Sequence, residues 1–208
     1  NSSLVTPQDG TQKEPDFKKK EKIEDKILIT YAGILSPFQG LDNILNAAKE
    51  LKEHKDLIFY LVGDGLIKDH LAQRIMAEHI SNVRLLSLQP RDEYLNITNS
   101  SDISLISLDD RMKAPCIPGK MLNLMAGKKP MIAVVPNDCE TAKIIKSSKS
   151  GIVVIPGNSE KLKNTILRLK NRPYLLKKLG ENGRRFFEKN MSIDENILIY
   201  EKIFKRSI

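Results

Sequence analysis

The feature that most constrains the fold is a regular alternation of short apolar segments with longer segments of helical periodicity. Apolar, β-prone runs occupy residues 27–32, 57–62, 82–86, 102–108, 130–135 and 151–155. Between the first two runs, apolar residues recur at helical spacing, at Leu41, Ile44, Leu45, Ala48 and Leu51. Apolar strands that alternate with helices are typical of a parallel sheet covered on both faces. The alternation therefore predicts a doubly wound, Rossmann-like α/β fold with a parallel sheet of about six strands.

The two ends of the chain differ from this alternating region. Residues 1–26 are polar, contain Pro7, Gly10 and Pro15, and carry few apolar side chains, so we expect a linker or flexible tail. Residues 27–208 are expected to form one domain with extra C-terminal helices, the last of which begins with a capping box at residues 192–195. The chain starts at Asn1 without a signal-peptide pattern, and we interpret it as a fragment of a longer protein.

Composition and charge narrow the class of protein. The apolar runs are far too short to span a bilayer, and two cysteines suit a reducing cytoplasm. The net charge of +8 favours anionic partners, but the basic residues gather near the two ends and are not interleaved with aromatic residues. We therefore expect no nucleic-acid partner. His54, His70 and His79 have no second ligand at metal spacing, so we expect no metal site.

Ligands of open parallel sheets bind at the carboxyl ends of the strands, so the loops there are the places to search. The loop at residues 33–40 ends a strand and opens a helix, whose N-terminus favours an anion. It lacks the spacing of a dinucleotide fingerprint, and the chain has no Walker sequence. In the later loop, Gly119 permits close backbone approach and Lys120 adds a cation at a helix start. These residues alone leave open a diphosphate site or a plain helix start with a solvated lysine.

A longer pattern surrounds Lys120. Residues 119–133 read GKMLNLMAGKKPMIA and are followed by ETAKII at 140–145 and GIVVIPG at 151–157. This pattern resembles the C-terminal domain of glycosyltransferase family 4, the group 1 transferases. It is most similar to a branch of bacterial surface-polysaccharide enzymes with a Pro-Ser-Lys element, which here reads Pro118-Gly119-Lys120. Segments 31–33, 39–42, 62–65 and 82–86 agree in order, so the resemblance runs from about residue 27 to the C-terminus.

The resemblance implies one half of a GT-B fold, in which two Rossmann-like domains face each other across a cleft. The second domain holds a nucleotide-sugar donor such as a UDP-sugar, with no further cofactor and no obligatory metal. Such enzymes move a hexose-type sugar to a polysaccharide or lipid-linked acceptor, generally with retention of anomeric configuration. The acceptor-binding N-terminal domain is missing here, so the fragment alone is expected to be inactive. We expect a cytoplasmic protein that can attach to the inner face of the membrane.

The resemblance also implies a set of donor-site residues, although no catalytic residue is assigned. Gly33, Leu35 and Gln39 are expected at the phosphates and the sugar, and Gly63 and Asp64 are expected to line the cleft. Leu88 and Gln89 are expected at the nucleobase. Gly119, Lys120 and Met121 are expected at the diphosphate, and Asn123 at the ribose. For Gly63 and Asp64, a tight turn with a helix cap explains the residues as well as a ligand contact does.

Several positions depart from the family pattern. Ile34 and Gln39 stand where the family often carries Arg and Lys, and Asn123 stands where it carries a ribose-binding glutamate. Lys128 replaces a glycine, and Pro115 lies near the position of a second glutamate. Two alternatives stay open. One is a nucleotide-sugar epimerase of GT-B fold, whose expected acid/base carboxylates and histidine are not evident here, and the other is a degenerate, non-catalytic binding domain, which Asn123 and Lys128 suggest.

Overall fold

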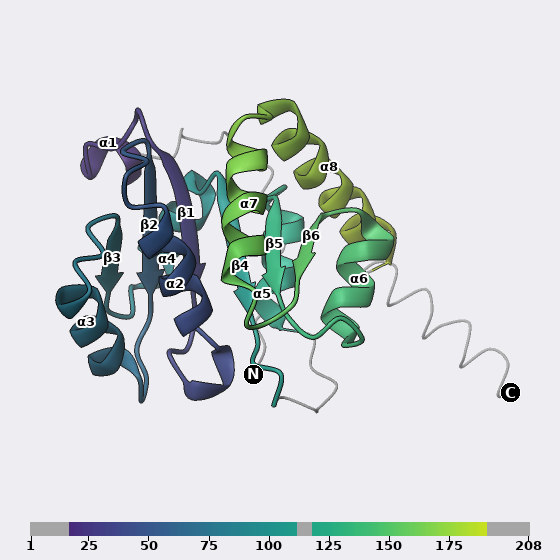
Figure 1. The fold of residues 1–208 in the computed structure, drawn as a ribbon. Helices are drawn as coiled ribbons and strands as arrows, with labels where there is room; N and C mark the ends of the chain where they lie inside the picture. Colours follow the sequence, from purple (N-terminus) through teal and green to yellow (C-terminus); the bar gives the residue numbers. More distant parts are fainter. Residues whose placement is uncertain (1–16, 112–117, 191–208) are drawn as a thin grey trace, which may run out of the picture.

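A six-stranded sheet forms the centre of the computed structural model, which describes residues 17–111 and 118–190 (Figure 1). All strand pairs are parallel, and the strand order is β3-β2-β1-β4-β5-β6. The strands are β1 (Ile27–Ala32), β2 (Leu57–Val62), β3 (Val83–Leu86), β4 (Ile103–Ser107), β5 (Met131–Val134) and β6 (Gly151–Val154). The prediction of a Rossmann-like parallel sheet of about six strands is confirmed. The predicted helix at the C-terminus lies outside the described residues.

Helices cover both faces of this sheet (Figure 1). They are α2 (Asp42–Glu50), α3 (Lys68–Ala77), α4 (Arg91–Ser100), α5 (Gly119–Ala126), α6 (Glu140–Ser148), α7 (Ser159–Lys170) and α8 (Pro173–Asn190), and a short 3-10 helix, η1 (Pro37–Gln39), precedes α2. Because side chains alternate along a strand, Ile29 and Tyr31 pack against α2 and α7 on one face of the sheet, whereas Leu28 packs against α4 on the other face. Among the described helices, none has the length and apolar character that a membrane crossing needs.

The strand order creates a switch point between β1 and β4. Successive strands wind outward from β1 to β3, and the chain then returns to place β4 on the other side of β1. The loops that follow β1 and β4 therefore diverge at the carboxyl edge of the sheet, where open α/β folds bind their ligands. The N-terminus of α5 lies on the chain segment that follows β4, so it belongs to the same edge.

The N-terminal boundary differs from the sequence prediction. Residues 17–26 are no loose tail, because α1 (Phe17–Lys20) packs against the sheet next to α4. The ring of Phe17 meets the ring of Tyr60 edge-on at 5.2 Å between centroids, and the Tyr60 hydroxyl donates to Glu21 at 2.9 Å. Two buried apolar side chains, Phe17 and Ile23, anchor this polar segment, and an average over its composition cannot reveal them. Residues 1–16 lie outside the described part of the chain.

Lys120 lies at the start of α5, and at the other end of that helix α8 packs very close to the backbone of Lys128. A Cβ atom on Gly180 of α8 would lie 2.0 Å from the carbonyl oxygen of Lys128. Lys128 itself has φ 56°, the left-handed conformation that commonly follows a helix C-terminus. The contact between α5 and α8 thus depends on a glycine in one helix and on a left-handed residue just after the other.

Candidate functional site

Lys120 brings a positive charge to the carboxyl end of β1. Its Nζ atom lies 3.9 Å from the centroid of the Tyr31 ring, and a Cβ atom placed on Gly33 would be 3.2 Å from the same Nζ. Lys120 belongs to α5, which packs on the opposite face of the sheet from Tyr31. The lysine therefore reaches across the sheet edge at the switch point. Loop 33–40 contains no charged residue, so Lys120 supplies a cation to a neutral loop.

Tyr31 links this cation to the loop that follows β1. The phenol hydroxyl lies 2.8 Å from the carbonyl oxygen of Ile34 and 3.0 Å from Oε1 of Gln39, and it can donate its proton to either. Burial raises the pKa of Tyr31 well above its ordinary value, so the hydroxyl stays protonated and can donate across the physiological range. Gly33, Gln39 and Lys120, three predicted site residues, are thus gathered around one side chain.

The loops after β1 and β2 are in direct backbone contact. A Cβ atom on Gly63 would lie 1.8 Å from the carbonyl oxygen of Gly33, and one on Gly65 would lie 2.3 Å from that of Leu35. The amide of Gly33 donates to Val62 and that of Leu35 to Asp64, both at 2.9 Å. Only glycine fits at positions 63 and 65, so Gly63 shapes the edge by letting two loops approach.

The carboxylate of Asp64 binds the loop after β3 and is thus engaged within the protein. Its carboxylate accepts hydrogen bonds from the ammonium of Lys68 and, at 2.6 Å, from the backbone amide of Leu88. These two donors lower the pKa of Asp64 below its usual value. Leu88 is 71% exposed, and the Gln89 amide donates to the carbonyl oxygen of Ser87 at 3.0 Å. The predicted pair Leu88 and Gln89 is therefore placed on an exposed loop that Asp64 anchors.

Two residues predicted to contact the ligand, Leu35 and Met121, have side chains that do not reach the carboxyl edge of the sheet. Leu35 and Met121 are both 0% exposed and belong to the apolar core. The backbone groups of Leu35 are also engaged, because its amide donates to Asp64 and its carbonyl oxygen accepts from Ile67. The amide of Met121 donates to the carbonyl oxygen of Pro118 at 2.8 Å. Both residues therefore belong to the core on which the site is built.

The remaining predicted residues lie on the exposed side of α5. Gly119 forms the first residue of the helix and is exposed, with no atom within 4 Å of a Cβ placed on it. Asn123 is exposed one turn further along. The first amides of a helix lack partners within that helix, so Gly119, Lys120 and the helix end together form a place that attracts anions. Asn123 lies on the same helix and can hydrogen-bond a neighbouring part of a ligand.

A hollow of about 350 Å³ lies beside this site, between η1, the start of α2 and the segment after β4. The charged side chains that line it are paired with neighbouring side chains. The Arg111 Nε donates to Asp109 at 2.6 Å and holds the pKa of that carboxyl at about 2, while Asp42 accepts from Arg74 at 2.6 Å. Among residues 17–111 and 118–190, no group of three or more His, Cys, Asp and Glu side chains is arranged to hold a metal ion.

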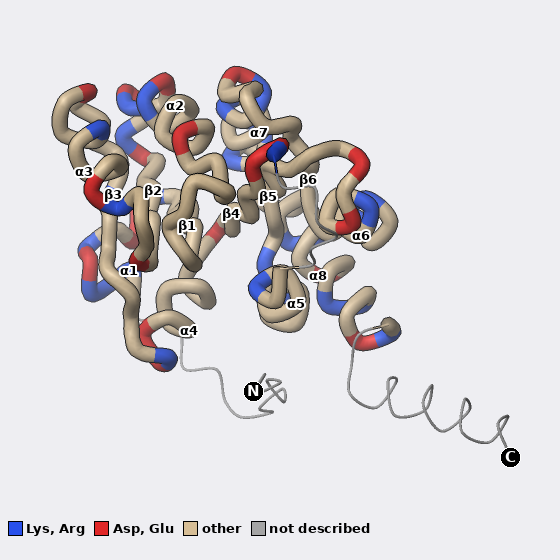
Figure 2. The backbone as a smooth tube through the Cα atoms, turned by 90° about the horizontal axis from the view of Figure 1, so that it is seen from below, with Lys and Arg blue, Asp and Glu red and all other residues tan. Residues whose placement is uncertain are grey.

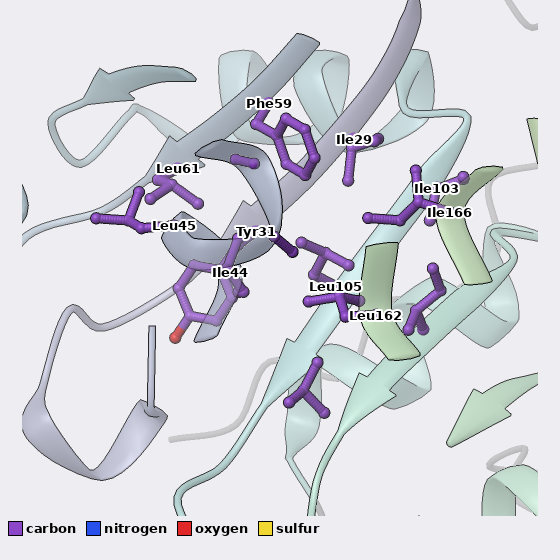
Figure 3. Packing of buried hydrophobic residues seen from close by; sticks show 14 of the residues in the cluster. Ile29, Tyr31, Ile44, Leu45, Phe59, Leu61, Ile103, Leu105, Leu162 and Ile166 are labelled. Atoms are coloured by element: carbon purple, nitrogen blue, oxygen red, sulfur yellow. The ribbon is translucent and has the colours of Figure 1, made fainter. Parts of the chain in front are cut away.

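Sequence reasoning missed Tyr31 as a site residue. It placed Tyr31 in an apolar strand and in a segment that matches the family pattern, but gave it no role at the ligand. The side chain is indeed buried, at 0% exposure. Figure 3 shows the ring at the margin of the core cluster, with its hydroxyl oxygen pointing out of the cluster. The available signal was a single aromatic residue with a hydroxyl group, near the end of a mostly aliphatic strand and two positions before a glycine.

The carboxyl edge, seen in Figure 2, has most Lys and Arg residues on the outer helices rather than over the central strands. The fold and this edge define a Rossmann-like α/β domain with an anion-attracting helix start at its switch point. The chain belongs to the family of glycosyl transferases group 1, whose family model matches residues 12–186. The sequence interpretation as a group 1 glycosyltransferase domain is therefore confirmed.

Known proteins resemble this chain in sequence or in fold. An uncharacterized glycosyltransferase of Methanocaldococcus jannaschii, MJ1069, is 27% identical over 199 residues, which cover 93% of this chain and 48% of that protein. The structure of Anabaena HepE in complex with UDP-glucose has a TM-score of 0.77 at 16% identity, over 94% of this chain and 54% of HepE. WaaG, a glycosyltransferase involved in lipopolysaccharide biosynthesis, has a TM-score of 0.72 at 18% identity, over 88% of this chain and 48% of WaaG. The chain thus spans about half the length of these proteins.

Proposed function

We propose that this domain is the donor-binding half of a glycosyltransferase and holds a nucleoside-diphosphate sugar, such as a UDP-sugar, at the carboxyl edge of its sheet. The observation that carries the proposal is the Lys120 ammonium, which lies over Tyr31 and beside Gly33 at the start of α5. A cation and helix amides at one point suit a diphosphate better than a neutral ligand. HepE, a similar structure, is in complex with UDP-glucose.

In the proposed reaction, the acceptor hydroxyl approaches the anomeric carbon on the face from which the diphosphate leaves. Its oxygen bonds to that carbon as the bond from the carbon to the diphosphate breaks, and the hydroxyl proton passes to an oxygen of the departing diphosphate. Negative charge grows on the departing diphosphate, and Lys120 together with the first amides of α5 stabilises that charge. The reaction needs no metal in this scheme and retains the anomeric configuration. The acceptor is a growing polysaccharide or a lipid-linked sugar, held by an N-terminal domain that pairs with this one.

Binding without transfer is the second candidate function. Asn123 favours it, because an exposed amide stands where the family carries a carboxylate, and an amide makes weaker hydrogen bonds to ribose hydroxyls. Product analysis with labelled UDP-sugars separates the candidates, since transfer, epimerisation and simple binding leave different sugars on different carriers. An epimerase of the same fold changes the sugar while it stays on the nucleotide.

The first prediction tests the diphosphate site. Lys120→Ala is expected to weaken UDP binding about tenfold or more at low salt, because hydrogen bonds to charged groups contribute about 1.5–3 kcal/mol. Affinity for uridine should stay unchanged, since uridine carries no phosphate. Added salt should reduce the difference between the two proteins. Calorimetric or NMR titration of both proteins with UDP and uridine measures these effects.

The matched control for this experiment is Lys161→Ala. Lys161 is exposed in the first turn of α7, so its loss removes the same charge at another helix start. UDP affinity of this control should remain that of the wild type. Equal losses in both variants would mean that net charge, not a diphosphate site, sets the affinity, and equal UDP affinity of Lys120→Ala and wild type would remove Lys120 from the site.

A further inference from the structure

We infer that Tyr31 is a positioning residue that holds the Lys120 ammonium at the donor site. The inference rests on the proposed function only for its consequence in binding. Its geometric basis is the 3.9 Å distance between Nζ and the ring centroid. A cation at this distance from the face of an aromatic ring is attracted by the ring electrons. Tyr31 would therefore favour one location for the ammonium at the end of this long side chain.

The ring can act as a fixed platform because the core holds it. Tyr31 is 0% exposed and packs in the cluster formed by β1, β2, β4 and the helices α2 and α7. Strand pairing fixes its backbone on both sides, to Leu61 of β2 and to Leu105 of β4. A lysine side chain loses conformational freedom when it is ordered, so a rigid partner in the free protein lowers the cost of ordering it on ligand binding.

The hydroxyl of the same side chain organises the opposite wall of the site. It lies within hydrogen-bond distance of the Ile34 carbonyl oxygen and of the Gln39 amide, both in the loop after β1. The face of one phenol thus contacts the cation from α5, while its hydroxyl contacts the loop after β1. Tyr31 sets the distance between these two walls, across which a diphosphate would lie.

The first test measures, by NMR of the free protein, whether Lys120 lies over the Tyr31 ring. The ε-methylene protons of Lys120, assigned by their loss in Lys120→Ala, should resonate upfield of those of the other lysines, because the ring shields protons above its face. Tyr31→Phe keeps the ring and should keep this shift, whereas Tyr31→Leu should abolish it. An ordinary lysine shift in the wild type overturns the inference, and this measurement is valid whether or not the leucine variant folds.

The second test asks whether Tyr31 acts through Lys120. Tyr31→Leu is expected to weaken UDP binding about two- to fivefold, the size of an exposed cation–π interaction. Tyr31→Phe keeps the ring and removes only the hydroxyl, so it should weaken UDP binding less than Tyr31→Leu does. In the Lys120→Ala background, Tyr31→Leu should bind UDP no more weakly than Tyr31→Phe, because the ring then has no cation to hold. Uridine affinity should be equal in all variants, with thermal unfolding as the check that each one folds.

The outcomes separate the inference from the proposed function. A shielded Lys120 signal with no UDP binding would contradict the proposed function and leave the geometry standing. UDP binding that depends on Lys120 but not on Tyr31 would overturn the positioning role and keep the donor site. A difference between Tyr31→Leu and Tyr31→Phe that persists in the Lys120→Ala background, or a parallel loss of uridine affinity, would mean that the ring supports the fold and not the cation.

Discussion

At the scale of single residues, Lys128 shows that a departure from a family pattern need not affect the site. Lys128 follows the C-terminus of α5, whereas Gly119 and Lys120 begin that helix. Its φ of 56° explains why glycine suits this position in the family, since a Cβ atom is strained in the left-handed region. The replacement of a glycine by Lys128 therefore concerns stability and gives no reason to doubt donor binding.

A prediction at this scale follows from the strain at Lys128. Lys128→Gly relieves a left-handed residue, which gains about 1–2 kcal/mol, and adds chain entropy to the unfolded state, which costs about 0.5–1 kcal/mol. The expected net effect is a free energy of unfolding higher by about 0.5–1 kcal/mol, with a rise in Tm of about 2 °C. Urea and thermal unfolding measure it. Lys128→Ala keeps the Cβ atom and should bring no gain; an equal gain there would show that loss of the lysine charge is the cause.

Residue roles at the edge were only partly predictable from the sequence. Gly33, Gln39 and Lys120 come together around Tyr31 in the structure, whereas their contacts with a donor stay a prediction. The motif does not tell which way a side chain points, so Leu35 and Met121, whose side chains lie in the core, were expected at the ligand. The direction of a side chain depends on helix phase and loop geometry, which spacing alone does not specify.

At the scale of elements, periodicity was a good guide and composition was a poor one. The six predicted strands and the helices between them are present, because burial on both faces leaves long apolar runs in the sequence. The segment around α1 was missed. There, Phe17 and Ile23 provide the packing within a stretch rich in lysine, and isolated anchors of this kind give no periodic pattern.

A prediction at this scale concerns the ion pairs that join α2 to α3. Glu78 accepts from Arg74 at 2.6 Å and from Lys49 at 3.1 Å, and these donors lower its pKa to about 2. The folded state thus favours the charged carboxylate, whose unfolded pKa is about 4.3. The stabilisation by Glu78 is present above about pH 5 and is lost as the pH falls toward 2. The wild type should accordingly exceed Glu78→Gln in free energy of unfolding at pH 7, with the difference shrinking below pH 4.

Urea unfolding of both proteins between pH 7 and pH 3 measures this difference. The control is Glu53→Gln, since Glu53 is an exposed carboxylate 3.6 Å from Lys55 and exposed pairs contribute little. This control should resemble the wild type at every pH. A constant difference between wild type and Glu78→Gln from pH 7 to pH 3 would contradict the assigned role of the Glu78 charge.

At the scale of the whole molecule, the chain spans about half the length of the similar glycosyltransferases. From the proposed division of labour we predict that this chain binds UDP and transfers no sugar, because the acceptor site belongs to the other half. Incubation of the chain with labelled UDP-glucose and bacterial polysaccharide or lipid fractions should give no labelled product. A parent protein with both halves, assayed in parallel, is the positive control. Labelled product from the chain alone would contradict the two-domain scheme.

The contact between Gly63 and Gly33 also decides where the molecule can be redesigned. A Cβ atom at position 63 or 65 would collide with the carbonyl oxygens of the neighbouring loop, so these two positions accept no variation. Ile34 and Phe38 in the loop after β1 and Leu88 in the loop after β3, by contrast, are exposed. A mutant library aimed at a new donor sugar should therefore randomise these three positions and hold both glycines constant, since variants at the glycines would be lost to misfolding before selection could act.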